Sequence, residues 1–190
     1  MDRAQVSPEL APSEWVRRWA HLVPAHANVL DLACGKGRHA RYFAERSACV
    51  WAVDRDAGAL QSIDGLTRVR TLCLDLEGEE WPLLGQRFDA IVVTNYLFRP
   101  RLEDLLKLLD RAGVLIYETF MLGNEFFGPP RNPEFLLRED ELLHWASGRL
   151  KVVAFEQGRV EFPRPGMVQR ICARGPMAEW VSLNFKTERP

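Results

Sequence analysis

The chain has 190 residues, which is enough for one domain with a substantial hydrophobic core, and we expect a single domain over residues 1–190. Its hydrophobic fraction of 47% and charged fraction of 27% are typical of a soluble globular protein. The formal net charge of -1 predicts no broad basic surface, which disfavours a dedicated nucleic-acid-binding protein.

The cysteines and the apolar runs indicate where the protein works. Cys34, Cys49, Cys73 and Cys172 have no C-x-x-C spacing, so we expect no metal site. Cys49 and Cys73 lie in apolar runs, which predicts buried free thiols. The N-terminus has no signal-peptide pattern, and no apolar run approaches the ~20 residues that span a bilayer. We therefore expect a cytoplasmic protein with no membrane partner.

The N-terminal part predicts a helical lead-in over residues 1–24. Ser13 fits a helix N-cap, and Trp15 and Trp19 recur at helical spacing after it. We expect this helix to end near Pro24 and to pack against the core.

A strand, a glycine turn and a helix follow one another between residues 29 and 46. Val29 to Leu32 predict a buried strand, and Gly35 and Gly37 permit a tight turn before the helix. This arrangement places backbone N–H groups beside a small ligand. The run that begins at Gly35 also fits the dinucleotide fingerprint G-x-G-x-x-A, so a nicotinamide or flavin cofactor remains open.

Asp31 discriminates between the two kinds of cofactor. A carboxylate so close to the glycines would repel the pyrophosphate of a dinucleotide, whereas S-adenosylmethionine carries a sulfonium and an ammonium and no phosphate. The pattern D-x-A-x-G-x-G, from Asp31 to Gly37, resembles the first motif of class I S-adenosylmethionine-dependent methyltransferases, which most often have glycine where Ala33 stands. The resemblance implies that Asp31 and the backbone of residues 33–37 hold the methionine end of S-adenosyl-L-methionine.

Two further strands, at residues 48–53 and 69–74, are each predicted to end in an acidic residue. Asp54 lies about 20 positions beyond the glycine turn, where its carboxylate suits the ribose hydroxyls of either cofactor. The methyltransferase resemblance implies that Asp75 accepts from the adenine amine and that Leu76 offers its backbone N–H. The cofactor-binding residues predicted in this way are Asp31, Ala33, Gly35, Gly37, Arg38, Asp54, Arg55, Asp75, Leu76 and Asn95.

The rest of the chain completes an α/β pattern that ends in two strands without a helix between them, which predicts an antiparallel hairpin. Class I methyltransferases close their sheet in this way, whereas a dinucleotide fold ends with a parallel strand. The resemblance implies a Rossmann-like three-layer sandwich with a mostly parallel seven-stranded sheet, of order 3-2-1-4-5-7-6 and with strand 7 antiparallel. The remaining elements expected are helices at 57–63, 102–112 and 138–146 and strands at 88–93, 114–117, 149–155 and 167–173.

Residues 121–137 form a long connection rich in glycine, proline and aromatics, and we predict a lid over the pocket. The same run resembles a subset of small bacterial methyltransferases similar to tellurite-resistance methyltransferases. Methyltransferases that act on adenine or glutamine amino groups carry N-P-P-Y, and the run from Asn95 to Phe98 replaces it here, which disfavours those substrates. Residues 176–190 are expected to form a tail, and the resemblance implies that Trp15 or Trp19 borders the substrate pocket.

The predicted activity is methyl transfer from S-adenosyl-L-methionine to a small molecule. A thiol or a chalcogen oxyanion is a suitable acceptor, because neither requires a general base. The sequence identifies no secure catalytic residue; the candidates by position are His39, Tyr96, Glu118 and Arg131. Two alternatives stay open: an NAD-linked oxidoreductase and a catalytically silent cofactor-binding partner protein.

Overall fold

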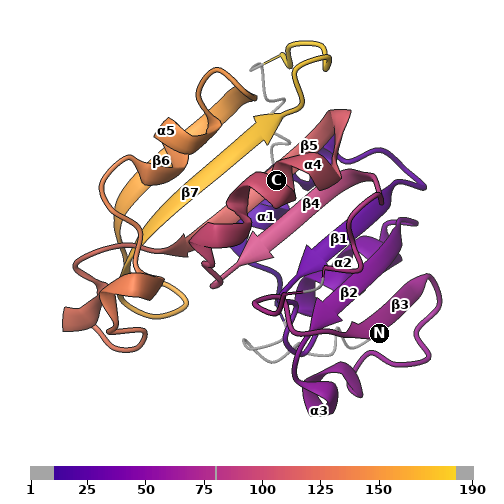
Figure 1. Cartoon of the computed structure of the whole chain (residues 1–190), viewed down its shortest axis with the longest axis horizontal. Helices are drawn as coiled ribbons and strands as arrows, with labels where there is room; N and C mark the ends of the chain where they lie inside the picture. Colours follow the sequence, from indigo (N-terminus) through magenta and orange to yellow (C-terminus); the bar gives the residue numbers. More distant parts are fainter. Residues whose placement is uncertain (1–10, 80, 183–190) are drawn as a thin grey trace, which may run out of the picture.

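The computed structural model describes residues 11–79 and 81–182. The described part folds into three layers, with helices on both faces of a sheet (Figure 1). The strands are β1 (Asn28–Leu32), β2 (Cys49–Asp54), β3 (Val69–Cys73), β4 (Phe88–Thr94), β5 (Leu109–Phe120), β6 (Lys151–Val160) and β7 (Gly166–Arg174). The α-helices are α1 (Glu14–Trp19), α2 (Arg38–Glu45), α3 (Ala57–Leu60), α4 (Leu102–Leu108) and α5 (Glu141–Ala146).

The strand order is β3-β2-β1-β4-β5-β7-β6, as the resemblance to class I methyltransferases implies. The neighbours from β3 to β5 pair in parallel, and β7 is antiparallel to both β5 and β6. The predicted terminal hairpin is therefore confirmed, and the parallel last strand of a dinucleotide fold is not what this chain forms. The carboxyl ends of β1 to β5 meet at one edge, where ligands bind in open α/β sheets.

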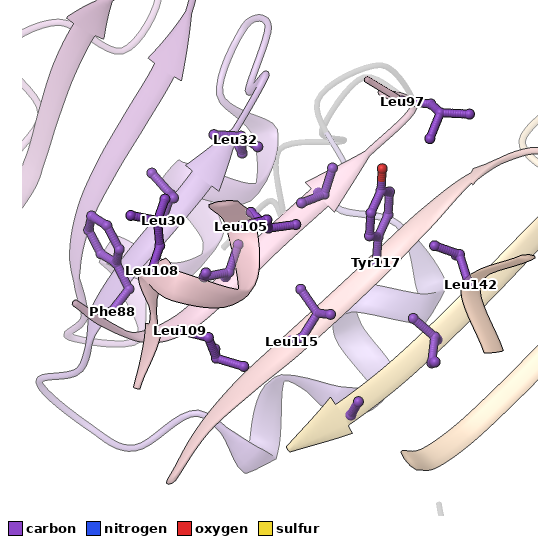
Figure 2. Close-up of a cluster of buried hydrophobic side chains, with 14 of the residues drawn as sticks. Leu30, Leu32, Phe88, Leu97, Leu105, Leu108, Leu109, Leu115, Tyr117 and Leu142 are labelled. Atoms are coloured by element: carbon purple, nitrogen blue, oxygen red, sulfur yellow. The ribbon is translucent and has the colours of Figure 1, made fainter. Parts of the chain in front are cut away.

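The central strands are buried on both faces because alternate side chains enter different layers. In β4, Ile91 and Val93 pack with α4 and α5, whereas Ala90 and Val92 pack with α1 and α2. Figure 2 shows the first of these clusters, in which Leu108 of α4 lies over the sheet. Two compact layers thus hold the strand ends in fixed positions.

The helix predicted over residues 102–112 ends earlier, at Leu108, and β5 begins at Leu109. Leu109 pairs with Phe88 instead of continuing the leucine-rich helix, and the register between β4 and β5 shifts just after this pair. Gly113 does not end a helix but lies inside β5, where a Cβ atom would come within 3.0 Å of the backbone oxygen of Asp89. Tertiary pairing here overrides helical periodicity.

Two other predicted helices are also shorter. The helix predicted at 57–63 is α-helical only over Ala57–Leu60, and the one predicted at 138–146 begins at Glu141. The prediction that Cys49 and Cys73 are buried is wrong, since both thiols are exposed. Cys73 ends β3, which is an edge strand and is only partly covered.

Parts of the predicted lead-in and tail, residues 1–10 and 183–190, lie outside the described residues. The described part of the lead-in contains α1, whose N-cap Ser13 accepts a hydrogen bond from the backbone N–H of Val16 at 3.1 Å, as predicted. Among the helices of the described residues, none is long and apolar enough to cross a membrane.

Candidate functional site

The turn between β1 and α2 has three residues with left-handed backbone angles. The φ angles are 54° at Ala33, 54° at Gly35 and 70° at Gly37. Glycine adopts this region without strain, whereas alanine does so at a cost. Gly37 is required for a second reason, because a Cβ atom there would clash with the side chain of Ile63. The predicted glycine turn is therefore present, and it brings backbone groups to the ligand-binding edge of the sheet.

Asp31 lies beneath this turn with 1% of its surface exposed. Its Oδ2 accepts a hydrogen bond from the backbone N–H of Ala40 at 2.9 Å, in the first turn of α2. The N-cap of α2 is Gly37, which has no side chain, so Asp31 supplies the carboxylate oxygen that caps such helices. Its Oδ1 is buried and has no hydrogen-bond partner within the described residues. Burial raises the pKa of Asp31 to about 7.

Asp54, the last residue of β2, accepts hydrogen bonds from the backbone of this turn and of the residues that follow β2. Its Oδ2 accepts from the N–H of Gly35 at 2.7 Å, and its Oδ1 accepts from the N–H of Asp56 at 2.9 Å. Each carboxylate oxygen has a second lone pair, so Asp54 keeps the capacity to accept from a ligand hydroxyl.

A first cavity of about 230 Å³ opens between these strand ends. It is lined by Ala33, Asp54, Arg55, Leu74, Asp75, Leu76, Glu77, Asn95 and Tyr96. Most of the residues predicted to bind the cofactor are thus brought together, with Asp31, Gly35 and Gly37 forming the adjoining corner. Arg38 instead lines a second cavity.

The first cavity is acidic and retains unused polar atoms. Three carboxylates, those of Asp54, Asp75 and Glu77, face one guanidinium, that of Arg55. The hydroxyl of Tyr96 is buried without a hydrogen-bond partner in the part of the chain that the structure describes. Burial is the largest cause that raises the pKa of Tyr96, so this hydroxyl stays protonated. Such a lining fits a nucleoside with a positive charge and disfavours a pyrophosphate.

A second cavity of about 270 Å³ meets the first at Asn95, which lines both. Between the backbone ends of β4 and β5, the N–H of Asn95 donates to the carbonyl of Glu118 at 2.9 Å. The second cavity is lined by Ala11, Pro12, Ser13, Glu14, Arg17, Arg38, Asn95, Glu118, Phe120, Val160, Phe162, Pro163, Arg164, Val168 and Arg170.

Of the candidate catalytic residues, Glu118 and Tyr96 line cavities. Glu118 lines the second cavity, where its Oε2 lies 2.6 Å from Nε of Arg170 in an ion pair that is mostly shielded from solvent. Tyr96 lines the first cavity. Arg131 is exposed and lines neither cavity.

His39 is a buried histidine that connects α2 to α1. Its Nε2 accepts from the N–H of Ser13 at 3.1 Å, and its Nδ1 lies 3.4 Å from Oγ1 of Thr94. Burial, followed by the positive charge of Arg38, lowers the pKa of His39 to about 3. The ring is neutral and lines neither cavity. Its two nitrogens contact Ser13 and Thr94, so His39 positions α1 against α2 and β4.

The two tryptophans of α1 line neither of these two cavities, whereas the resemblance implies that one of them borders the substrate pocket. Trp15 and Trp19 are each 2% exposed and belong to the core, and Nε1 of Trp15 donates to the carbonyl of Ile171 at 3.3 Å. The opposite face of the helix start, with Glu14 and Arg17, lines the second cavity instead.

The connection at 121–137 is fastened to the hairpin at its side. The amide nitrogen of Asn124 donates to the carbonyls of Gly128 and Pro130, and its oxygen accepts from the N–H of Met167. Beside this connection, the second cavity is lined by Phe120, Val160, Phe162, Pro163 and Arg164. The lid role of residues 121–137 stays a prediction.

Sequence reasoning missed the hairpin side of the second cavity. Arg170 and Val168 face it from β7, and Phe162 and Arg164 face it from the connection between β6 and β7. The signal available in the sequence was weak: Arg170 is a charged residue inside a predicted apolar strand.

Residues 29–113 match the family model of a methyltransferase domain. No curated protein matches the chain. Similar solved structures include TehB from Haemophilus influenzae, at 17% identity and TM-score 0.70, covering 85% of this chain and 61% of that one. Another is a TehB-like S-adenosylmethionine-dependent methyltransferase from Corynebacterium glutamicum, at 18% identity and TM-score 0.61, covering 85% of this chain and 86% of that one.

A third similar structure is the N-methyltransferase NodS from Bradyrhizobium japonicum in complex with S-adenosyl-L-homocysteine. Its identity is 16% and its TM-score 0.64, and the match covers 90% of this chain and 94% of that one. The chain thus spans 61% of the length of the Haemophilus protein and most of the other two. The match to a methyltransferase domain over residues 29–113 and the shared fold confirm the predicted resemblance to class I methyltransferases.

The left-handed alanine predicts a stabilising substitution. Ala33→Gly is expected to raise the free energy of unfolding by about 0.5–1 kcal/mol, because relief of backbone strain exceeds the added entropy of the unfolded chain. Ala44→Gly, in the regular backbone of α2, is the matched control and is expected to lower it by about 0.5–1 kcal/mol. Urea unfolding measures both; a loss of stability in both variants would contradict the strain at Ala33.

The raised pKa of Asp31 predicts a pH dependence with a defined sign. Between about pH 4 and pH 7, the folded protein keeps a proton on Asp31 that the unfolded chain has lost, so this residue lowers stability as pH rises. Asp31→Asn keeps an acceptor for the N–H of Ala40. Its free energy of unfolding, relative to that of the wild type, is expected to rise by at least ~1 kcal/mol from pH 5 to pH 8. Urea unfolding at both pH values measures this change. The lowered pKa of His39 makes stability rise with pH, but it does so equally in both proteins and cancels in their difference. Parallel pH profiles for the two proteins would show that Asp31 is ionised throughout.

Proposed function

We propose that the chain is an S-adenosyl-L-methionine-dependent methyltransferase that acts on a small molecule. The observation that carries this proposal is the meeting of two cavities at Asn95, at the carboxyl edge of the sheet. The first suits a cationic nucleoside, and the second is a separate space for an acceptor. Such a junction positions two reactants for direct transfer.

The residues of the first cavity fit the cofactor. Asp54 and Asp75 are acceptors of the kind that ribose hydroxyls and an adenine amine require, and the buried Oδ1 of Asp31 is an unused polar atom beside the turn. The unpartnered hydroxyl of Tyr96 is a further donor or acceptor for a ligand. The same acidic lining argues against the NAD-linked alternative, because a pyrophosphate would meet three carboxylates and one arginine.

When bound, S-adenosyl-L-methionine supplies an activated methyl group to a nucleophile. The chain's own residues contribute position and exclusion of water more than proton transfer. None of the candidate bases is free to take a proton. Both ring nitrogens of His39 have polar contacts, Glu118 forms an ion pair with Arg170, and the raised pKa of Tyr96 keeps its hydroxyl protonated. This supports an acceptor that is nucleophilic without a base, such as a thiol or a chalcogen oxyanion.

We also propose that the protein works in the cytoplasm. Its four cysteines are free, two of them exposed, which suits a reducing compartment.

Cofactor binding is tested by calorimetry. The full chain is expected to bind S-adenosyl-L-homocysteine and not NAD, and Asp54→Ala is expected to weaken that binding by ~1–3 kcal/mol through lost hydrogen bonds. Asp64→Ala, which removes an exposed carboxylate outside both cavities, is the matched control and should leave binding unchanged. Binding of NAD alone, or wild-type affinity in Asp54→Ala, would contradict the assignment.

Turnover is tested with S-adenosylmethionine labelled in its methyl group. Incubation with small thiols and with selenite or tellurite is expected to transfer the label, and RNA is expected to remain unlabelled. Transfer to an acceptor excludes the catalytically silent alternative. A protein that binds S-adenosyl-L-homocysteine but labels none of the small molecules would favour that alternative instead.

A further inference from the structure

The two adjoining cavities have opposite charge. Carboxylates dominate the first cavity, whereas the second has four arginines and two glutamates. The charged residues of the second cavity are Glu14, Arg17, Arg38, Glu118, Arg164 and Arg170. A ligand that is suited to one cavity is therefore poorly suited to the other.

Within the second cavity, polar and apolar surfaces follow each other along the paired strands β5 and β7. Glu118 lies opposite Arg170, next to the junction at Asn95. Two residues further along, Phe120 lies opposite Val168, and both side chains are more than nine-tenths buried. Residues two apart on a strand point to the same face and lie about 7 Å apart. An apolar wall thus begins two residues along β5 from the Glu118–Arg170 pair, which adjoins the junction at Asn95.

The arginines differ in how far their charge is already balanced. Arg170 is balanced by Glu118, and Glu156 lies 3.8 Å from its Nη1. Among the described residues, no carboxylate forms an ion pair with Arg17 or Arg164. The guanidinium of Arg164 lies over the ring of Phe120, 5.0 Å from its centroid, and donates to the carbonyl of Pro129 at 3.0 Å. A cation is therefore held directly over the apolar wall.

We propose that the methyl acceptor is an organic carboxylate with a small apolar body, an inference that rests on the proposed function and specifies its substrate class. The apolar body packs against Phe120 and Val168, and the carboxylate pairs with the guanidinium groups of Arg17 and Arg164. A thiol that carries a carboxylate meets this requirement and also needs no general base. Its sulfur takes the methyl group and loses its proton to solvent, S-adenosyl-L-homocysteine is released, and the carboxylate remains paired with the arginines. An inorganic oxyanion would use the arginines but leave the apolar wall in water, and an amine would meet an excess of like charge.

The experiment uses the full chain saturated with S-adenosyl-L-homocysteine and four probes: phenylacetate, phenylacetamide, 2-phenylethylamine and selenite. The first three share one apolar body and differ in charge. Calorimetry is expected to show phenylacetate binding at least ~10-fold more tightly than each of the other probes, since a charged hydrogen-bonded pair contributes 1.5–3 kcal/mol, or about 10–100-fold.

Two variants locate the carboxylate. Arg164→Gln and Arg17→Gln are each expected to weaken phenylacetate binding about 10-fold while leaving the affinity for S-adenosyl-L-homocysteine unchanged. Arg111→Gln is the matched control, because this exposed arginine at the start of β5 lines neither cavity. It should leave the affinity for both ligands unchanged.

The outcomes separate this inference from the proposed function. If S-adenosyl-L-homocysteine binds and phenylacetate binds no better than the amide, the amine or selenite, the carboxylate inference is overturned and the proposed function survives. Unchanged phenylacetate affinity in both arginine variants would also overturn it. If S-adenosyl-L-homocysteine itself fails to bind, the proposed function falls, and this inference about its acceptor falls with it.

Discussion

The hydrogen bond between the buried side chain of Asp31 and the backbone of Ala40 fixes the corner on which both cavities depend. Gly37 must stand at the start of α2 because its left-handed angle and the side chain of Ile63 leave no room for a Cβ atom. A glycine N-cap has no side chain that could accept from the first N–H groups of the helix, so Asp31, nine positions before Ala40 on β1, accepts from the N–H of Ala40. The bond joins the end of β1 to the start of α2, and it thereby sets the turn backbone against the first cavity and the side chain of Arg38 toward the second.

The same corner also sets the position of α1. His39, the second residue of α2, accepts from the backbone N–H of Ser13, and Ser13 in turn caps α1. Only a ring with an unprotonated Nε2 accepts this bond, and burial keeps the ring in that state. The helix start, with Arg17 one turn along, is thereby held at the mouth of the second cavity. A histidine beside a glycine turn suggests a general base, but its hydrogen bond to Ser13 shows that it connects α2 to α1.

The sheet order and most of the first cavity could be predicted because their signals are local or topological. Acidic residues at strand ends, such as Asp54, meet wherever parallel strands share an edge, so their convergence follows once the strands are recognised. The second cavity depends on information that no local pattern holds. Arg170 reaches Glu118 only through the register of β5 with β7, and the leucine-rich run before Gly113 changes from helix to strand because Leu109 pairs with Phe88. Long-range pairing decides both, and periodicity alone does not report it.

The opposite charges of the two cavities determine which ligand each side of the junction favours. Under the proposed function, the acidic cavity attracts the cationic cofactor and the arginines attract an anionic acceptor, so each ligand is disfavoured in the space meant for the other. Transfer of a methyl group from a cation to an anion removes one charge from each side, and both products are then held less strongly than the reactants. The buried pair of Glu118 and Arg170 stands at this boundary and is internally balanced. Because its charges cancel, this ion pair lies between the acidic and the arginine-rich cavities without attracting either ligand.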